Sequence, residues 1–236
     1  MVSKGARLVA LVSLVCAARV FCQESTHVKS SAWRNELSVG FAPTVFHAKY
    51  DGTNGDCWIN GYAFTIDCRA VHRSNGFCVA AKAAIGSAGG NALFPEESDS
   101  ADFALDMDNL SGWDWWLSCT AGKRFENDSL SFTPTAGLCT SWALMESSGQ
   151  LSYSGSTYYC DWEMRVFQLA LCADLAFEVI LTGKVSISAS LLVALTLWGS
   201  VSEDASISGV ASSTQEYSLD AGCVSFIPAF YLTIRL

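Results

Sequence analysis

Two adjoining stretches of sequence decide the fold: VFQLALCADLAFEVIL at 166–181 and VSISASLLVALTLW at 185–198, joined by Thr182-Gly183-Lys184. Apolar side chains take every second position in both stretches. The positions between them carry polar or small residues, including Gln168, Asp174, Glu178, Ser186, Ser188, Ser190 and Thr196. A period of two predicts strands, each with one apolar face. The three-residue turn would pair Leu181 with Val185 and so keep both apolar sets on one face of a hairpin.

The length of these strands indicates a membrane protein. Strands in soluble proteins average about 5–6 residues, whereas a tilted strand that crosses a bilayer needs about 9–11. Two long neighbouring strands with one apolar face are typical of a transmembrane β-barrel. One alternative is a soluble β-sandwich with long strands. The other is a helical hairpin in the membrane, which would place Asp174 near a helix centre at about 2.5–3.5 kcal/mol and leave the serine alternation unexplained.

The N-terminus has the pattern of a secretory signal. Lys4 and Arg7 precede an apolar run at 8–18, and Val20-Phe21-Cys22 offers a cleavage region, so we expect a signal peptide at 1–22. Beyond it no segment offers about 20 unbroken apolar residues, the length that a membrane helix needs. Half of the 236 residues are hydrophobic and only 16% are charged. A single barrel domain at 23–236, with its apolar half spread over alternate positions, explains this composition.

Charge and cysteine spacing narrow the function classes. Removing Lys4, Arg7 and Arg19 with the signal changes the formal charge from −9 to −12, which argues against nucleic acid as a partner. No pair or cluster of cysteine and histidine has the spacing of a metal site, so we expect no metal and no cofactor. Cys57 and Cys160 both fall in expected loops on one side, and a disulfide between them is one option.

The whole chain divides into about eight such strands. They are expected at 37–47, 58–72, 77–85, 113–124, 130–144, 166–181, 185–198 and 222–236. The connections alternate between short turns and long external loops, which are expected near 49–57, 87–112, 145–161 and 200–217. Within the second of these loops, apolar spacing over 102–110 predicts a short surface helix. Even strand number, short turns on one side and long loops on the other are features of bacterial outer-membrane barrels. The predicted fold is an all-β, antiparallel, up-and-down transmembrane barrel.

The face assignments predict which side chains line the barrel interior, here called the lumen. The candidates are Asp67, Arg69, Lys82, Trp116, Asp174, Glu178 and Trp198. Asn75-Gly76 is a two-residue hairpin signal that would pair Ser74 with Phe77 and set Lys82 opposite Arg69. The two tryptophans are expected in the outer half, above Asp67 and Asp174. The sequence therefore predicts an apolar upper chamber over a charged floor.

The sequence resembles the small outer-membrane β-barrel proteins of the OmpW and OmpA-transmembrane type. The likeness is one of architecture over nearly all the mature chain. The C-terminal AFYLTIRL at 229–236 is similar to the family's assembly signal, although Leu236 stands where a terminal Phe is usual. The cysteine content and the Phe21-Cys22 region resemble a spirochaetal member. The resemblance implies a bacterial outer-membrane location with membrane lipid as a partner.

Catalysis is not expected. His72-Arg73-Ser74-Asn75 is similar to a segment of the outer-membrane lipid A deacylases, and Ser beside His is a nucleophile–base grouping. However, these residues fall in a short turn, whereas the deacylase segment belongs near the outer leaflet, so turn formation explains them better. Asp174 and Glu178 are four apart on one strand, about 13 Å, which favours solvated lumen charges. The loop acids also match no known calcium-site spacing; they are Glu96, Glu97, Asp99, Asp102, Asp106 and Asp108.

Three functions remain open from sequence. The first is a narrow, porin-like pore or lateral conduit for small, hydrophobic molecules, as resemblance to OmpW implies. The second is a surface adhesin that binds host or surface ligands through long loops carrying Tyr153, Tyr158 and Tyr159. The third is a structural barrel without transport, and a lipid-modifying hydrolase is a minor alternative. An eight-stranded barrel encloses space for side chains or for one small ligand, so lumen width separates the first function from the others.

Overall fold

The computed structural model describes residues 32–50, 57–90, 103–107 and 110–236, and these residues form one antiparallel sheet. Eight strands carry the fold: β1 (Trp33–Ala48), β2 (Cys57–His72), β3 (Phe77–Gly90), β5 (Leu110–Lys123), β7 (Leu130–Tyr153), β8 (Ser156–Ile180), β9 (Val185–Ile207) and β11 (Val224–Arg235). The expected signal peptide at 1–22 and most of the loop near 49–57 lie outside the described residues. Across the described ranges, no helix is both long enough and apolar enough to span a bilayer.

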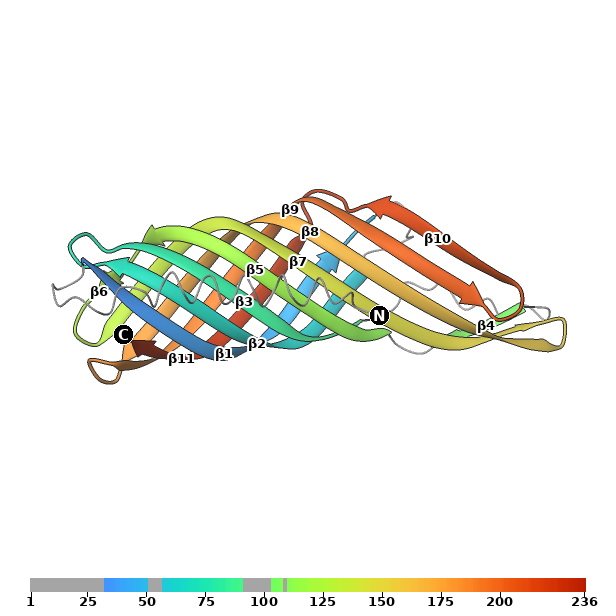
Figure 1. The fold of residues 1–236 in the computed structure, drawn as a ribbon, viewed down its shortest axis with the longest axis horizontal. Helices are drawn as coiled ribbons and strands as arrows, with labels where there is room; N and C mark the ends of the chain where they lie inside the picture. The colour runs from blue at the N-terminus through green and yellow to red at the C-terminus, as the bar shows by residue number, and fades with distance from the viewer. Residues whose placement is uncertain (1–31, 51–56, 91–102, 108–109) are drawn as a thin grey trace.

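The eight strands close into a barrel. Each pairs with the next in the order β1-β2-β3-β5-β7-β8-β9-β11, and β11 returns to pair with β1, always antiparallel. Figure 1 shows the strands tilted around a common axis, with the short turns gathered at the end that holds the C-terminus. We call this the turn end and the opposite one the outer end. The predicted eight-stranded antiparallel barrel is confirmed.

Side chains alternate between the two sides of the barrel wall. In β8 and in β9 up to Thr196 the burial pattern alternates, as a strand with one buried and one exposed face requires. The outward positions are large and apolar, and Phe230 and Ile85 remain 67% and 59% exposed. A soluble protein rarely exposes so continuous an apolar surface. This outer belt fits the hydrocarbon layer of a membrane.

The outer end differs from the expected long loops. The stretch at 145–161 is not a loop, because β7 and β8 continue through it and turn only at Ser154-Gly155, where both residues have positive φ. The stretch at 200–217 is likewise mostly strand, since β9 runs to Ile207 and pairs back with β10 (Ala211–Ser218). Polar, serine-rich sequence predicted loops, but the strands of the barrel wall extend into it.

The predicted helix at 102–110 is wrong where the structure describes that stretch. Residues 103–107 form strand β4 (Phe103–Met107), which pairs with the outer part of β7. β4, β7, β8, β9 and β10 thereby build a sheet that projects beyond the barrel at the outer end, visible at the right of Figure 1. Pairing to a neighbouring strand outweighed the local helical spacing, a common outcome for a segment this short.

The turn between β2 and β3 corrects one predicted register. β2 ends at His72, so the connection has four residues rather than two, and Lys82 lies opposite Asp67 instead of Arg69. The Gly76 amide donates to the carbonyl of His72, and Gly76 has a φ of 71° that favours glycine. A shift of two residues preserves the faces, so every inward and outward assignment on these strands is unaffected. The Thr182-Gly183-Lys184 turn does set Leu181 beside Val185 as expected.

Candidate functional site in the barrel interior

The middle of the lumen holds a layer of ion pairs. Arg69 lies 2.5 Å from Asp67, and Lys82 Nζ lies 2.8 Å from Asp174 Oδ2. Lys82 also donates to Ser190 Oγ at 3.0 Å and stands over the Tyr231 ring at 5.4 Å. Because β3 and β8 are not neighbours in the sheet, the Lys82–Asp174 contact spans the lumen. Two acids and two bases balance, so the layer carries no net charge.

A second ionic layer closes the turn end. Arg124 is its centre: it contacts Glu36 at 2.8 Å and also pairs with Glu178 and Glu126. Arg235 adds a contact with Glu178 at 3.0 Å, and Arg34 adds one with Glu126 at 2.6 Å. Ser131 and Ser186 donate further hydrogen bonds to Glu178. The three arginines and three glutamates again balance, and they tie neighbouring strands into one rigid rim.

Glu126 lies in this rim but outside the membrane-spanning strands, in the two-residue strand β6 (Phe125–Glu126) that pairs with β7. Partial burial raises the pKa of its carboxyl, but the hydrogen bond from Arg34 and the charge of Arg124 outweigh that effect. The pKa of Glu126 falls from 4.5 to about 2. This carboxylate therefore stays charged in strongly acidic solution.

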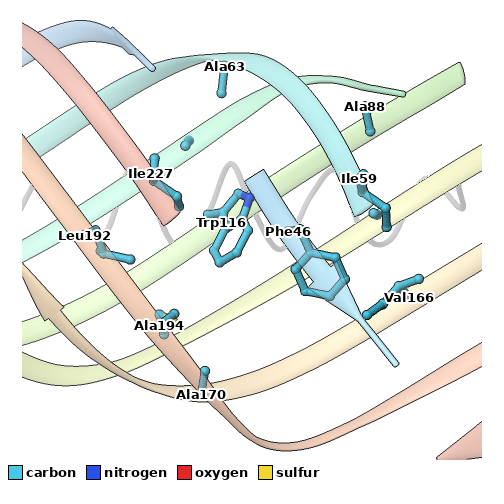
Figure 2. Close-up of a cluster of buried hydrophobic side chains, with 14 of the residues drawn as sticks. Phe46, Ile59, Ala63, Ala88, Trp116, Val166, Ala170, Leu192, Ala194 and Ile227 are labelled. Carbon is cyan, nitrogen blue, oxygen red and sulfur yellow. The ribbon is translucent and has the colours of Figure 1, made fainter. Parts of the chain in front are cut away.

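The outer half of the lumen is mainly apolar, although Ser141, Gln168 and Thr196 form a buried hydrogen-bonded group there. Figure 2 shows Phe46 and Trp116 at its centre, surrounded by smaller side chains; the labelled ones are Ile59, Ala63, Ala88, Val166, Ala170, Leu192, Ala194 and Ile227. The Phe46 and Trp116 rings meet edge to face with centroids 6.0 Å apart. A cavity of about 10 Å³ remains beside them, lined by residues that include Asp114 and Ser141. That space holds about one water molecule, so this chamber is plugged by its own side chains.

Asp114 is the acidic residue of this chamber, whose other buried polar side chains include Ser141 and Gln168. Its side chain is buried, and Oδ2 accepts a hydrogen bond from Trp116 Nε1 at 3.3 Å. Oδ1 has no hydrogen-bond partner among the described residues. The other buried lumen acids, Glu36, Asp67, Asp174 and Glu178, each have an ion pair, whereas none is formed by Asp114 in the described part of the chain.

The predicted lumen residues fall into two groups. Asp67, Arg69, Lys82, Trp116, Asp174 and Glu178 all lie inside the barrel and are at most 6% exposed. Trp198 does not: it is 58% exposed on the outer surface and packs against Phe167. A β-bulge explains the error, because Leu169 lies opposite Trp198 while Ala170 lies opposite Thr196. Leu197 is the extra residue, and from there on the two faces of β9 exchange positions.

The barrel wall has a weak seam between β1 and β11. Their ladder pairs Phe41 with Phe230, stops, and resumes only at Val45 with Phe226. The register on both sides sets Pro43 opposite Pro228. Neither proline has an N–H to donate, so two ladder bonds are missing at this point. Three inward-facing residues within the gap, Ala42, Ile227 and Ala229, belong to the apolar cluster of the upper chamber.

Some lumen and wall residues of this candidate site are missing from the sequence-based expectation. Glu36, Arg124 and Arg235 sit at strand ends, where face assignment by alternation is least reliable. Asp114 could have been found, since it shares its parity with Trp116 on one strand. The proline pair also had a signal, because proline inside a long strand marks an edge or an irregularity.

The projecting sheet carries a groove at the outer end. Its volume is about 680 Å³, and β7, β8, β9 and β10 supply most of its polar lining, including Glu146, Asp161, Glu163 and Asp204. Arg165 contacts two of these acids, Glu163 and Asp204. Within the described ranges, no group of three or more potential ligands has the geometry of a metal site.

At the turn end, Ser74 Oγ and His72 Nδ1 are 3.1 Å apart. The His72 ring packs edge-on against Trp33, with centroids 5.0 Å apart. The pair lies in the connection between β2 and β3, at the surface. A nucleophile–base pair needs a third group to orient the base, and no carboxylate is bonded to His72 in the contacts that the structure describes.

Solved outer-membrane proteins share this fold. A major outer membrane protein from Thermus thermophilus matches with a TM-score of 0.54 at 11% identity, over 86% of this chain and 99% of that one. Outer membrane protein OprG from Pseudomonas aeruginosa has a TM-score of 0.45 and 12% identity, over 86% and 96% of the two chains. Ail of Yersinia pestis, solved with the heparin analogue sucrose octasulfate, has a TM-score of 0.42 and 17% identity, over 86% and 99%. No protein-family model matches the chain, and no curated protein matches it in sequence.

The fold and the exposed apolar belt lead to the same conclusion. The barrel closes on itself with eight antiparallel strands, its outer face is apolar, and charged residues such as Asp67, Lys82 and Asp174 are turned inward. Strands can span lipid only as a closed barrel, because an open sheet edge would leave backbone N–H and C=O groups without hydrogen bonds. The chain is a small eight-stranded β-barrel with the fold of a bacterial outer-membrane protein.

Proposed function

We propose that this barrel is a gated lateral conduit, which admits a small apolar solute at the outer end and releases it sideways into the membrane. The observation that carries this proposal is the unpaired wall segment at Pro43 and Pro228, which lies beside the apolar chamber. The solute would enter the chamber around Phe46 and Trp116 and leave through that segment. We further propose that the barrel is not an enzyme, because turn formation accounts for Ser74 and His72.

The ionic floor supports a sideways exit over a straight one. A solute that continued downward would have to break the Lys82–Asp174 contact and then the rim around Arg124. Breaking a buried pair by removing one partner costs about 3–5 kcal/mol. An apolar solute has no charged or hydrogen-bonding group that could replace the lost partner. The wall gap beside the chamber requires no ion pair to break. The easier path therefore leads into the bilayer.

The plug implies that the conduit is closed at rest. An open lumen would leave its lining accessible to water, yet Trp116 is 4% exposed and Phe46 4%. Edge-to-face aromatic pairs contribute about 0.5–1.5 kcal/mol beyond the burial of the rings. Opening the chamber would require one ring to swing aside, together with the buried side chains nearer the outer end, such as Met145 and Met164.

Replacing the plug tests the proposal. Trp116→Ala should increase the rate at which naphthalene reaches the bilayer of vesicles whose outer leaflet contains lipopolysaccharide, a leaflet that slows direct entry. Naphthalene fluorescence would report its arrival. Trp198→Ala is the matched control, because that tryptophan lies on the outer surface and should leave the rate unchanged. Equal rates for wild type, Trp116→Ala and protein-free vesicles would reject transport.

A second function, surface binding, is supported by the projecting sheet. Its strands project beyond the closed barrel (Figure 1) and carry the 680 Å³ groove, and Tyr153 and Tyr159 are 55% and 66% exposed there. Tyrosine is common at protein interfaces. Host or surface ligands would then bind this sheet, with the barrel as anchor. This candidate gains weight if the naphthalene experiment fails.

A further inference from the structure

We infer that Asp114 makes the conduit selective for solutes that carry a positive charge on an apolar body, such as small aromatic amines. This inference rests on the proposed function and names the class of solute that the chamber would take. It depends on three features of the chamber: an unpaired carboxylate, aromatic walls, and a position at the outer end.

The first feature is the missing counter-charge. Asp114 is 4% exposed, and Oδ1 has no hydrogen-bond partner among the described residues. A buried carboxylate without a base is costly, since burial removes its water, and the hydrogen bonds from Trp116 and Thr44 supply no counter-charge. Elsewhere in the lumen, each buried acid is matched by Arg69, Lys82, Arg124 or Arg235. Among the residues that the structure describes, no base pairs with Asp114, so the chamber can accommodate one positive charge from a ligand.

The second feature is the surroundings of that carboxylate. The cavity beside Asp114 is lined by Phe46 and Trp116 together with Ser141 and aliphatic residues. Aromatic faces attract cations, with Trp the best and most of all when water is excluded. A compact, strongly hydrated metal ion would find few oxygen ligands here. An organic ammonium fits better, because its charged group can pair with the carboxylate and its apolar body can pack against the apolar walls. The ammonium would contact Asp114, and its apolar body would occupy the space that the Phe46 ring now fills.

The third feature is the position along the path. β5 starts at Leu110 at the outer end, so Asp114 lies above Trp116 and well above the level of Lys82. An entering cation would meet the carboxylate before it met the positive charges of the floor. Lys82 and Arg69 would then oppose its further descent and favour the sideways exit. The order of charges along the lumen thus supports the same route as the wall gap.

Equilibrium binding tests this selectivity with two probes of nearly equal size, benzylamine, which is a cation at pH 7, and benzyl alcohol, which is neutral. Binding to the refolded protein in nonionic micelles would be measured by saturation-transfer NMR, with empty micelles as the blank. Wild type should bind benzylamine at least about tenfold more tightly, the ratio that about 1.4 kcal/mol produces. Asp114→Asn should bring the two affinities together, and Asp114→Glu should restore the preference. Asp128→Asn, at an exposed turn, should keep the wild-type ratio.

The possible outcomes distinguish failure of this inference from failure of the proposed conduit function. If wild type binds benzyl alcohol as tightly as benzylamine, the role of Asp114 is overturned, but the conduit proposal is not. A preference that survives in Asp114→Asn would also overturn it. Failure of both probes to bind wild type and Trp116→Ala would reject the chamber as a binding site, and both proposals with it.

Discussion

At the scale of single residues, Lys82 is the most informative side chain in the lumen. It faces inward on β3, while its neighbour Ala81 faces the membrane side. A cysteine at position 82 should therefore resist a maleimide confined to the lipid phase, and one at position 81 should react. Labelling yields on the folded protein would be compared by mass spectrometry. The reverse pattern would shift β3 by one residue and exchange its faces.

The Lys82–Asp174 pair should also be needed for stability. Lys82→Met leaves a buried carboxylate with only the more distant Arg69, whose contact is 3.9 Å. We expect unfolding in urea to become easier by about 3 kcal/mol, the lower end of the cost of breaking a buried pair. Adding Asp174→Leu should recover most of that loss, because the charge is then removed. No loss in the single variant would mean that water reaches this layer.

At the scale of strands and turns, the two prolines of the seam can be replaced. Pro43→Val and Pro228→Val together return two N–H donors to facing positions and let the β1–β11 ladder run unbroken. Each new bond should add about 0.5–1.5 kcal/mol to the free energy of unfolding. If the seam is the exit, naphthalene delivery should fall at the same time. Pro134→Val, in β7 and away from the seam, is the control that should not change delivery.

The rim at the turn end should respond to acid. Glu126 has a folded-state pKa of about 2, below its ordinary value of 4.5, so its contribution to stability is present above 4.5 and is lost as the pH falls toward 2. Glu126→Gln should therefore flatten the dependence of urea unfolding on pH across that window. A variant with the same pH dependence as wild type would mean that Arg34 and Arg124 do not hold this carboxylate in solution.

Elements of the fold could be predicted from the sequence to different extents. Alternation at period two identified all eight barrel strands, because one face must meet lipid along its whole length. It failed at Leu197, where one extra residue exchanges the faces of β9 and moves Trp198 outside. Asn75-Gly76 suggested a two-residue turn, but the hydrogen bond from Gly76 to His72 closes a longer one. The projecting strands were missed because their hydroxyl-rich sequence has no continuous apolar face to alternate.

The sequence was sufficient to predict which charged residues line the lumen, but not that side chains fill the lumen. Parity alone identified Asp67, Lys82 and Asp174 as lumen residues. It could not show that Lys82 reaches across to Asp174, since that contact joins strands three places apart in the ring. Nor could it separate a filled lumen from an open one, because the packing of Phe46 against Trp116 depends on the width and shear of the closed barrel.

At the scale of the whole molecule, the protein should behave as an integral membrane barrel. It should partition into the detergent phase of a cloud-point extraction and migrate differently on gels before and after heating, because the closed hydrogen-bonded ring resists detergent at low temperature. The exposed apolar belt is poorly solvated by water, so the outer face needs lipid or detergent. Purification as a detergent-free monomer would contradict the barrel assignment.

The central claim is that the β1–β11 seam is the way out of the barrel, and a reversible lock tests it most directly. The register sets Ala42 opposite Ala229, both buried and inward-facing beside the gap. A disulfide between Ala42→Cys and Ala229→Cys would tie the two strands together there. We predict that the oxidised double variant stops delivering naphthalene to the bilayer and that a reductant restores the wild-type rate. Delivery that continues unchanged with the seam locked would contradict the account.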